Sequence, residues 1–247
     1  MALLSVRNVT MAFGSLIAND DVTFDIDAGG IVGLIGPNGA GKTTLFNCIS
    51  GICRPTSGTI HFDGVNITHS PACRTARLGA VRTFQVVRPL QEMTVTDNVM
   101  VGAFLRHRNP AAARAEANEC IGLCKLDDFR NKRAGDLTIG TKKRLEVARA
   151  LATGARLLML DEAMAGLTST EVKESVELIT HLREKGLTLL VVEHIMEAIM
   201  PIADKLVVLD GGKKIAEGPP DEIIHDERVV AAYLGKKFSQ KMKPAVA

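Results

Sequence analysis

Short runs of apolar residues recur along the chain and predict buried strands. Ile31 to Ile35, Leu157 to Leu160 and Thr188 to Val192 contain almost no polar side chains. Such runs are typical of strands that are buried on both faces, as in parallel sheets. Looser alternation of apolar and polar positions at Leu3 to Phe13 and Val22 to Ile26 predicts strands with one face toward water.

The segment from residue 89 to residue 151 has a different pattern and is predicted to be largely helical. We expect one helix over Asp97 to Leu105 and another over Ala111 to Leu126. The second follows Asn109-Pro110, a capping residue and a proline that suits the first helical position. Further helices are predicted over Lys142 to Thr153, Glu171 to Lys185 and Pro220 to Leu234.

Together these elements predict an α/β fold with a mostly parallel central sheet, an antiparallel β subdomain and a helical insert. The antiparallel part comes from the N-terminal strands and a hairpin that turns at Asp63-Gly64. No low-complexity linker divides the chain, so we expect a single domain over residues 1–247. Its predicted parts are a core with the β subdomain (1–88 and 152–235), a helical subdomain (89–151) and a basic tail (236–247).

Composition narrows the class of protein. Hydrophobic content of 46% and charged content of 23% are ordinary for a globular protein, and a net charge of +2 argues neither for nor against a nucleic-acid partner. No apolar run approaches the roughly 20 residues of a membrane-spanning helix, so another chain would supply any such part. Zinc-ligand spacing is absent. We therefore predict buried or half-buried free thiols at Cys48, Cys53, Cys73, Cys120 and Cys124.

A phosphate-binding loop is predicted between the strand at Ile31 to Ile35 and the helix that follows. Glycines let such a loop turn with positive φ, so several N–H groups point at one anion, and the helix N-terminus adds positive charge. We expect Lys42 to reach the β- and γ-phosphates of a nucleoside triphosphate and the Thr43 hydroxyl to ligate Mg²⁺. The loop reads Gly36-Pro37-Asn38-Gly39-Ala40-Gly41-Lys42-Thr43-Thr44.

Polar side chains follow other predicted strands at the ends that would meet the nucleotide. Asp161 and Glu162 come directly after Leu160, and we expect Asp161 to hold Mg²⁺ and Glu162 to polarise an attacking water. Gln85 ends a short strand and is either a ligand of Mg²⁺ or water, or an exposed loop amide. His194 is a candidate γ-phosphate sensor, although a lone histidine is usually structural.

Three further features are weaker taken alone. Leu137 to Thr141 precedes a predicted helix, and a cap at Thr138 or Thr141 would leave an anion-binding N-terminus. Phe13 is a candidate for stacking on a purine base, although packing in the core or turn is the simpler explanation. Basic residues of the helical segment form either a solvated face or a docking surface for a partner.

The order of these motifs resembles the ATP-binding cassette subunits of membrane transporters over about Leu3 to Gly235. An aromatic residue, phosphate loop, glutamine, helical insert, signature, Asp-Glu pair and histidine follow one another with family-like spacing. Details resemble the branched-chain amino-acid importer branch, whose close relatives handle other amino acids, amides or urea. The stretches that carry this finer resemblance are Arg82-Thr83-Phe84-Gln85, Met164 to Thr168, Val192-Glu193-His194 and Ala232 to Gly235.

The resemblance implies a role for each motif. Phe13 becomes the adenine-stacking residue, and Gln85 becomes the coupling glutamine beside Mg²⁺. Asp161 becomes the Mg²⁺ aspartate, Glu162 the catalytic glutamate and His194 the switch histidine. The signature would contact the γ-phosphate of ATP held by the opposite subunit, through Thr138, Ile139, Gly140 and Thr141.

The signature departs from the family's usual Leu-Ser-Gly-Gly-Gln. Thr138 keeps a hydroxyl and Gly140 keeps the close approach, so contact with phosphate can survive, but Thr141 lacks the long amide of glutamine. Ala163 and Thr168 also replace residues common in the family, proline and aspartate. We expect hydrolysis and dimerisation to persist, with the ATP site that this signature completes being the weaker one.

The resemblance also implies partners and location. We expect a homologous ATPase subunit, in a homodimer or heterodimer, two transmembrane permease subunits and, indirectly, a periplasmic binding protein. The chain would lie on the cytoplasmic face of the inner membrane, bind ATP and Mg²⁺, and contact no nucleic acid. Two alternatives stay open: a soluble cassette ATPase of translation or DNA repair, and a regulatory cassette that binds ATP with little hydrolysis.

Overall fold

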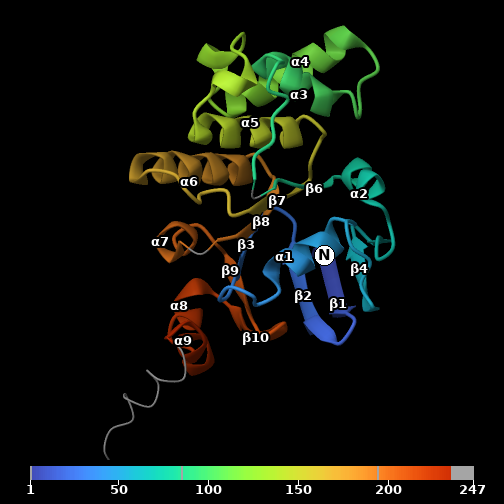
Figure 1. Ribbon diagram of the computed structural model, residues 1–247, viewed down its shortest axis with the longest axis vertical. Coiled ribbons are helices and arrows are strands. Elements are labelled where there is room, and N and C mark those ends of the chain that lie inside the picture. Colours follow the sequence, from blue (N-terminus) through green and yellow to red (C-terminus); the bar gives the residue numbers. More distant parts are fainter. Residues whose placement is uncertain (1, 85, 194, 235–247) are drawn as a thin grey trace, which may run out of the picture.

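Two sheets form the framework of the computed structural model, which describes residues 2–84, 86–193 and 195–234. The central sheet has six strands in the order β10-β9-β3-β8-β7-β6, and all neighbours except the β9–β10 hairpin are parallel. The second sheet is antiparallel, in the order β2-β1-β4-β5 (Figure 1). The α/β fold with a mostly parallel sheet and an antiparallel β part is therefore confirmed.

The strands match the predicted apolar runs, with longer N-terminal strands than the alternation suggested. They are β1 (Ala2–Phe13), β2 (Leu16–Asp27), β3 (Ile31–Ile35), β4 (Ser57–Phe62), β5 (Val65–Asn66), β6 (Ala80–Arg82), β7 (Leu157–Asp161), β8 (Thr188–Val192), β9 (Lys205–Asp210) and β10 (Lys213–Gly218). The β4–β5 hairpin turns at Asp63-Gly64 as predicted, where both residues have positive φ.

The helices lie mostly in the predicted segments. They are α1 (Lys42–Ile49), α2 (Ala72–Leu78), α3 (Val95–Ala103), α4 (Pro110–Leu123), α5 (Ile139–Leu151), α6 (Ser169–Glu184), α7 (Met196–Ile199), α8 (Pro220–Ile223) and α9 (Glu227–Leu234), with 3₁₀ turns at Asp127–Phe129 and Ala134–Asp136. None of the described helices is both long and apolar enough to cross a membrane.

Capping side chains explain two of the helix boundaries that were predicted wrongly, the starts of α3 and α5. Helix α3 begins two residues before Asp97 because the Thr94 hydroxyl accepts a hydrogen bond from the Asp97 N–H. Helix α5 begins at Ile139, capped by Thr138, and not at Lys142. Helix α4 ends at Leu123, three residues earlier than predicted.

The single helix predicted over Pro220 to Leu234 is also wrong, because the structure has two helices there. Helix α8 ends at Ile223 and α9 begins at Glu227. The Asp226 carboxylate accepts hydrogen bonds from the backbone and side chain of Arg228, so it starts a new helix instead of continuing the old one. The cysteine prediction holds for four thiols, but Cys73 is exposed.

The central sheet is buried on both faces, which explains its uninterrupted apolar runs. Along β7, Leu158 and Leu160 pack into the core formed with α3, α5 and α6. Leu157 and Met159 point the other way and pack with α1 and the antiparallel sheet. Figure 1 shows the helices α3 to α6 above the central sheet, with the antiparallel sheet beside it. Because β6, β7, β8, β3 and β9 pair in parallel, their carboxyl ends lie at the same edge of the central sheet.

Candidate functional site

The loop after β3 turns tightly and delivers α1 with its N-terminus toward a cavity. Gly36 and Gly41 have φ values of 149° and 94°. A Cβ at Gly36 would collide with the Leu209 carbonyl oxygen, and one at Gly41 would collide with that of Ala18. Only glycine meets both the conformational and the steric demand at these two positions.

Lys42 lies against the loop that it was predicted to serve. Its ammonium donates hydrogen bonds to the carbonyl oxygens of Gly36 (2.8 Å) and Pro37 (3.0 Å). Burial lowers the pKa of Lys42, and the negative charges of Glu162 and Asp161 oppose that shift. The predicted cation and both predicted carboxylates therefore lie close enough to interact electrostatically.

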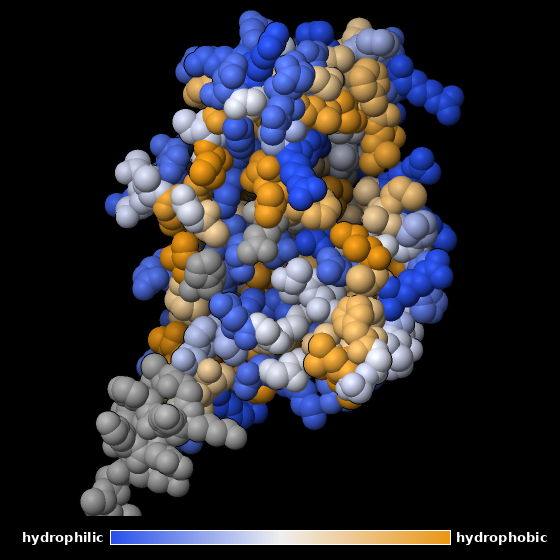
Figure 2. Space-filling model, viewed as in Figure 1, coloured by the Kyte–Doolittle hydropathy of each residue, from blue (hydrophilic) through white to orange (hydrophobic). Residues whose placement is uncertain are grey.

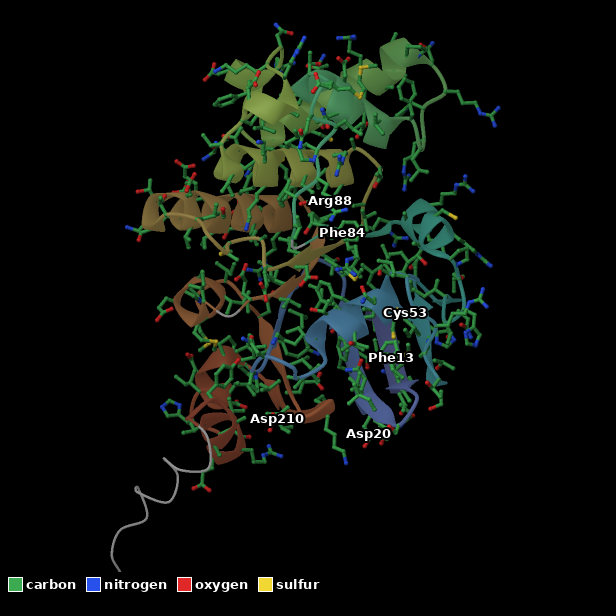
Figure 3. All side chains as sticks on the ribbon, viewed as in Figure 1. Phe13, Asp20, Cys53, Phe84, Arg88 and Asp210 are labelled. Atoms are coloured by element: carbon green, nitrogen blue, oxygen red, sulfur yellow. The ribbon has the colours of Figure 1, made fainter. Side chains whose placement is uncertain are left out.

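A cavity of about 1100 Å³ opens over the loop and is large enough for a nucleoside triphosphate. One wall carries an apolar rim from the β1–β2 hairpin, where Phe13 (labelled in Figure 3) is 50% exposed. Its ring is therefore not a core residue and is available to a flat ligand. The other lining residues are Leu16, Ile17, Ala18, residues 36–44, Glu162, Gly211, Gly212 and Tyr233.

Asp161 ends β7 and is almost completely buried, with 2% exposure. Its carboxylate accepts a hydrogen bond at 2.7 Å from Arg82, whose side chain is also buried. Burial raises the pKa of Asp161, and the Arg82 charge opposes the increase. Arg82 also donates to the Asn47 side chain of α1 and lies over the Phe84 ring.

Arg82 contacts the site through Asp161, and no motif of the sequence identified this contact. The available signal was a charged side chain within the short strand predicted before Gln85, since a charge that becomes buried in a sheet is almost always paired. The oxygen donors of Asp161 and Thr43 fit Mg²⁺, which binds one or two protein oxygens together with substrate phosphates. Across the described residues no cluster of His, Cys, Asp and Glu offers a separate metal site.

Glu162 lines the cavity and has an unusual backbone. Its φ is 49°, in the left-handed region that a non-glycine residue rarely adopts. Its N–H donates to the Val192 carbonyl oxygen (3.0 Å), and its own carbonyl oxygen accepts from Lys143 (3.2 Å). Strained backbone that is held from both sides is typical of functional positions.

The predicted signature lies apart from the cavity lining. The Thr138 hydroxyl caps α5 by accepting from the Thr141 N–H, and the two hydroxyls are 2.9 Å apart. Ile139 is 63% exposed, and a Cβ at Gly140 would collide with Glu171. Within one chain the signature and the phosphate loop therefore do not share a site. Gln85 and His194 fall outside the described residues, so their predicted roles remain predictions.

The family models match most of the chain. Residues 19–165 match the ABC transporter model, and residues 213–239 match the branched-chain amino acid ATP-binding cassette transporter model. The chain belongs to the ABC transporter family. As an ABC cassette it is an ATPase subunit coupled to transport, and neither alternative in the sequence analysis is favoured.

Similar proteins cover almost the full length of the chain. The high-affinity branched-chain amino acid transport ATP-binding proteins BraF of Pseudomonas aeruginosa and LivG of Escherichia coli are both 41% identical. Each match covers 95% of this chain and 98% of the relative. A solved nucleotide-free ATP-binding cassette from an ABC transporter has a TM-score of 0.87 and 30% identity, and covers 96% of this chain and 100% of that one.

Proposed function

We propose that this ABC cassette hydrolyses ATP to drive import of branched-chain or related amino acids through separate membrane subunits. The observation that carries the proposal is one cavity that joins the phosphate loop to Glu162, in a chain 41% identical to branched-chain amino acid transport ATP-binding proteins. The match of residues 213–239 to the branched-chain cassette model supports the same substrate class.

In the proposed mechanism the chain's own groups bind the nucleotide and orient the reaction. Phe13 stacks on the adenine ring, and the N–H groups of residues 36–44 hold the phosphates together with Lys42. Glu162 accepts a hydrogen bond from the attacking water and orients it toward the γ-phosphate, where His194 also acts. Bound Mg²⁺ would neutralise phosphate charge, with Thr43, Asp161 and Gln85 as its residues.

The site is completed by a second cassette in this proposal. The signature of one subunit, Thr138 to Thr141, contacts ATP held by the phosphate loop of the other. Its position outside the cavity of its own chain supports this arrangement. A solved dimer of another ABC cassette, with ADP and phosphate bound, is 25% identical and has a TM-score of 0.78. The second cassette is either another copy of this chain or a different cassette, depending on which subunits make up the transporter.

An exposed apolar surface offers a place for the membrane subunits. It lies at the junction between the predicted helical subdomain and the core, where Figure 3 labels Phe84 and Figure 2 shows apolar side chains among polar ones. Large exposed apolar groups on one region usually mark an interaction site. The exposed large apolar side chains between residues 84 and 104 are Phe84, Val86, Leu90, Met93, Val101 and Phe104, and we propose that together they form this docking surface. Docking there would hold the cassette at the cytoplasmic face of the membrane.

The proposal is tested by capturing the tagged chain from its native membrane and identifying the proteins that accompany it. We expect two permease subunits and an ATPase partner. The Val101→Asp variant should lose the permease subunits but keep ATP binding, because Val101 is 45% exposed on α3 within the docking surface. Val65→Asp is the matched control, since Val65 is an exposed valine on β5, outside the residues that define the docking surface.

Recovery of ribosomal or DNA-bound proteins without permease subunits would contradict the transport proposal. Equal recovery of permease subunits with Val101→Asp and with the unmodified chain would contradict the docking surface alone. Uptake of radiolabelled leucine by vesicles that carry the captured complex then tests the substrate class. Uptake of a chemically related amino acid but not leucine would narrow the proposed substrate class. Uptake of only an unrelated amino acid would contradict that class.

A further inference from the structure

Helix α5 directs two charged side chains of its second turn inward, toward the loops of the ATP site. Lys143 donates from its ammonium to the carbonyl oxygens of Glu162 (3.2 Å) and Ala165 (2.6 Å). Glu146, 7% exposed, accepts a hydrogen bond from the Phe84 N–H at 3.1 Å. The two residues are three positions apart and so lie on the same face of the helix.

The backbone that Lys143 contacts is a strained turn. Glu162 has a φ of 49°, and its carbonyl oxygen also accepts from the Ala165 N–H at 3.1 Å. The Met164 N–H donates to the buried Glu193 carboxylate at 2.8 Å. A left-handed non-glycine residue persists only where surrounding contacts hold it, and here Lys143 contributes two of them.

The surroundings of Lys143 favour a strong interaction. Burial lowers its pKa, while the carboxylates of Glu193, Glu146 and Glu162 all act to keep it protonated. Hydrogen bonds from a charged donor are stronger than neutral ones, and the side chain of Lys143 is partly buried. A neutral side chain of the same length would leave the Glu162 and Ala165 carbonyl oxygens without this donor.

We propose that Lys143 is a positioning residue that fixes the backbone of Glu162 and ties it to the signature helix α5. The proposal rests on the proposed function, because it assumes that Glu162 orients the attacking water. Helix α5 begins with the signature, which would contact the partner's ATP, whereas Glu162 lines the cavity of its own chain. Lys143 therefore joins the two ATP sites of a dimer through one side chain.

The test compares Lys143→Met with Lys142→Met in the assembled transporter. Lys142 is its matched control, because it is the preceding lysine of α5 but donates to Gly135 outside the loop (2.8 Å). In Lys143→Met we expect amide hydrogen exchange at residues 162–165 to become about tenfold faster or more. We also expect kcat for ATP to fall about tenfold with KM within about twofold. Lys142→Met should match the unmodified protein in amide exchange at residues 162–165, in kcat and in KM.

Lys143→Arg separates positioning from general loss of structure, because it keeps the charge and should restore slow exchange and most of kcat. Unchanged exchange at residues 162–165 in Lys143→Met would overturn the proposal, whatever happens to activity. So would faster exchange throughout the chain in Lys143→Met that Lys143→Arg does not reverse. A failure of the proposed function can be told apart from a failure of the Lys143 proposal, because hydrogen exchange at residues 162–165 is measured without ATP hydrolysis.

Discussion

Arg82 illustrates what one residue contributes at the ATP site. It lies in a buried strand, where its charge needs a partner, and it finds one in Asp161. The sequence predicted a buried strand that ends at Asp161, and the role of Asp161 as a Mg²⁺ ligand stays a prediction. The pairing with Arg82 was not predicted, because strand periodicity does not reveal which strands are neighbours. Strand β6 pairs with β7 in parallel register, and that pairing brings Arg82 beside the carboxylate.

Arg82→Met should destabilise the chain by about 3 kcal/mol, because it leaves the Asp161 carboxylate buried without its cation. Chemical denaturation of the purified subunit measures this change. Arg156→Met is the control, since the Arg156–Asp63 pair is half exposed and its removal should change stability little. Equal losses in the two variants would show that burial of the Arg82 pair does not set its contribution.

Phe13→Ala should weaken ATP binding roughly tenfold, because it removes the aromatic ring of the cavity rim. The folding stability should hardly change, since Phe13 is half exposed. Titration of the subunit with ATP by calorimetry measures the affinity, and Phe13→Trp is the control that keeps a stacking surface. Unchanged affinity in Phe13→Ala would exclude stacking on the base.

At the scale of elements, the buried strands were the most predictable part of the fold. Burial on both faces requires apolar runs, and each of β3, β7 and β8 coincides with one. Helix boundaries were less predictable, because one capping side chain shifts them by several residues. Thr138 starts α5 inside the signature, and Asp226 divides the C-terminal segment into two helices. The sequence contained both capping residues, but many threonines and aspartates cap nothing.

Thr138→Ala should destabilise the chain by about 1 kcal/mol, because the Thr141 N–H at the start of α5 loses its acceptor. Thr138→Ser keeps the hydroxyl and should retain stability close to that of the unmodified chain. Thermal unfolding of both variants gives the comparison. If the alanine variant were as stable as the serine variant, the cap would not stabilise α5.

At the scale of the whole molecule, the fold separates the groups that the proposed ATP hydrolysis needs, so that each ATP site requires residues from two chains. The loop at residues 36–44 and Glu162 share one cavity, whereas the signature stands at the start of α5 outside it. The sequence predicted this division only through a family resemblance, since motif spacing gives no distance between two parts of a fold. Each ATP in a dimer would thus depend on both subunits, and the altered signature should weaken the site it completes.

The most direct test of the account is the Glu162→Gln variant, measured for phosphate release and for ATP binding with the partner subunit present. Glutamine keeps the size of the side chain that lines the cavity but cannot act as a carboxylate. The account predicts loss of turnover by about a hundredfold or more with ATP affinity retained. Normal phosphate release by Glu162→Gln would contradict the assignment of Glu162 and the mechanism built on it.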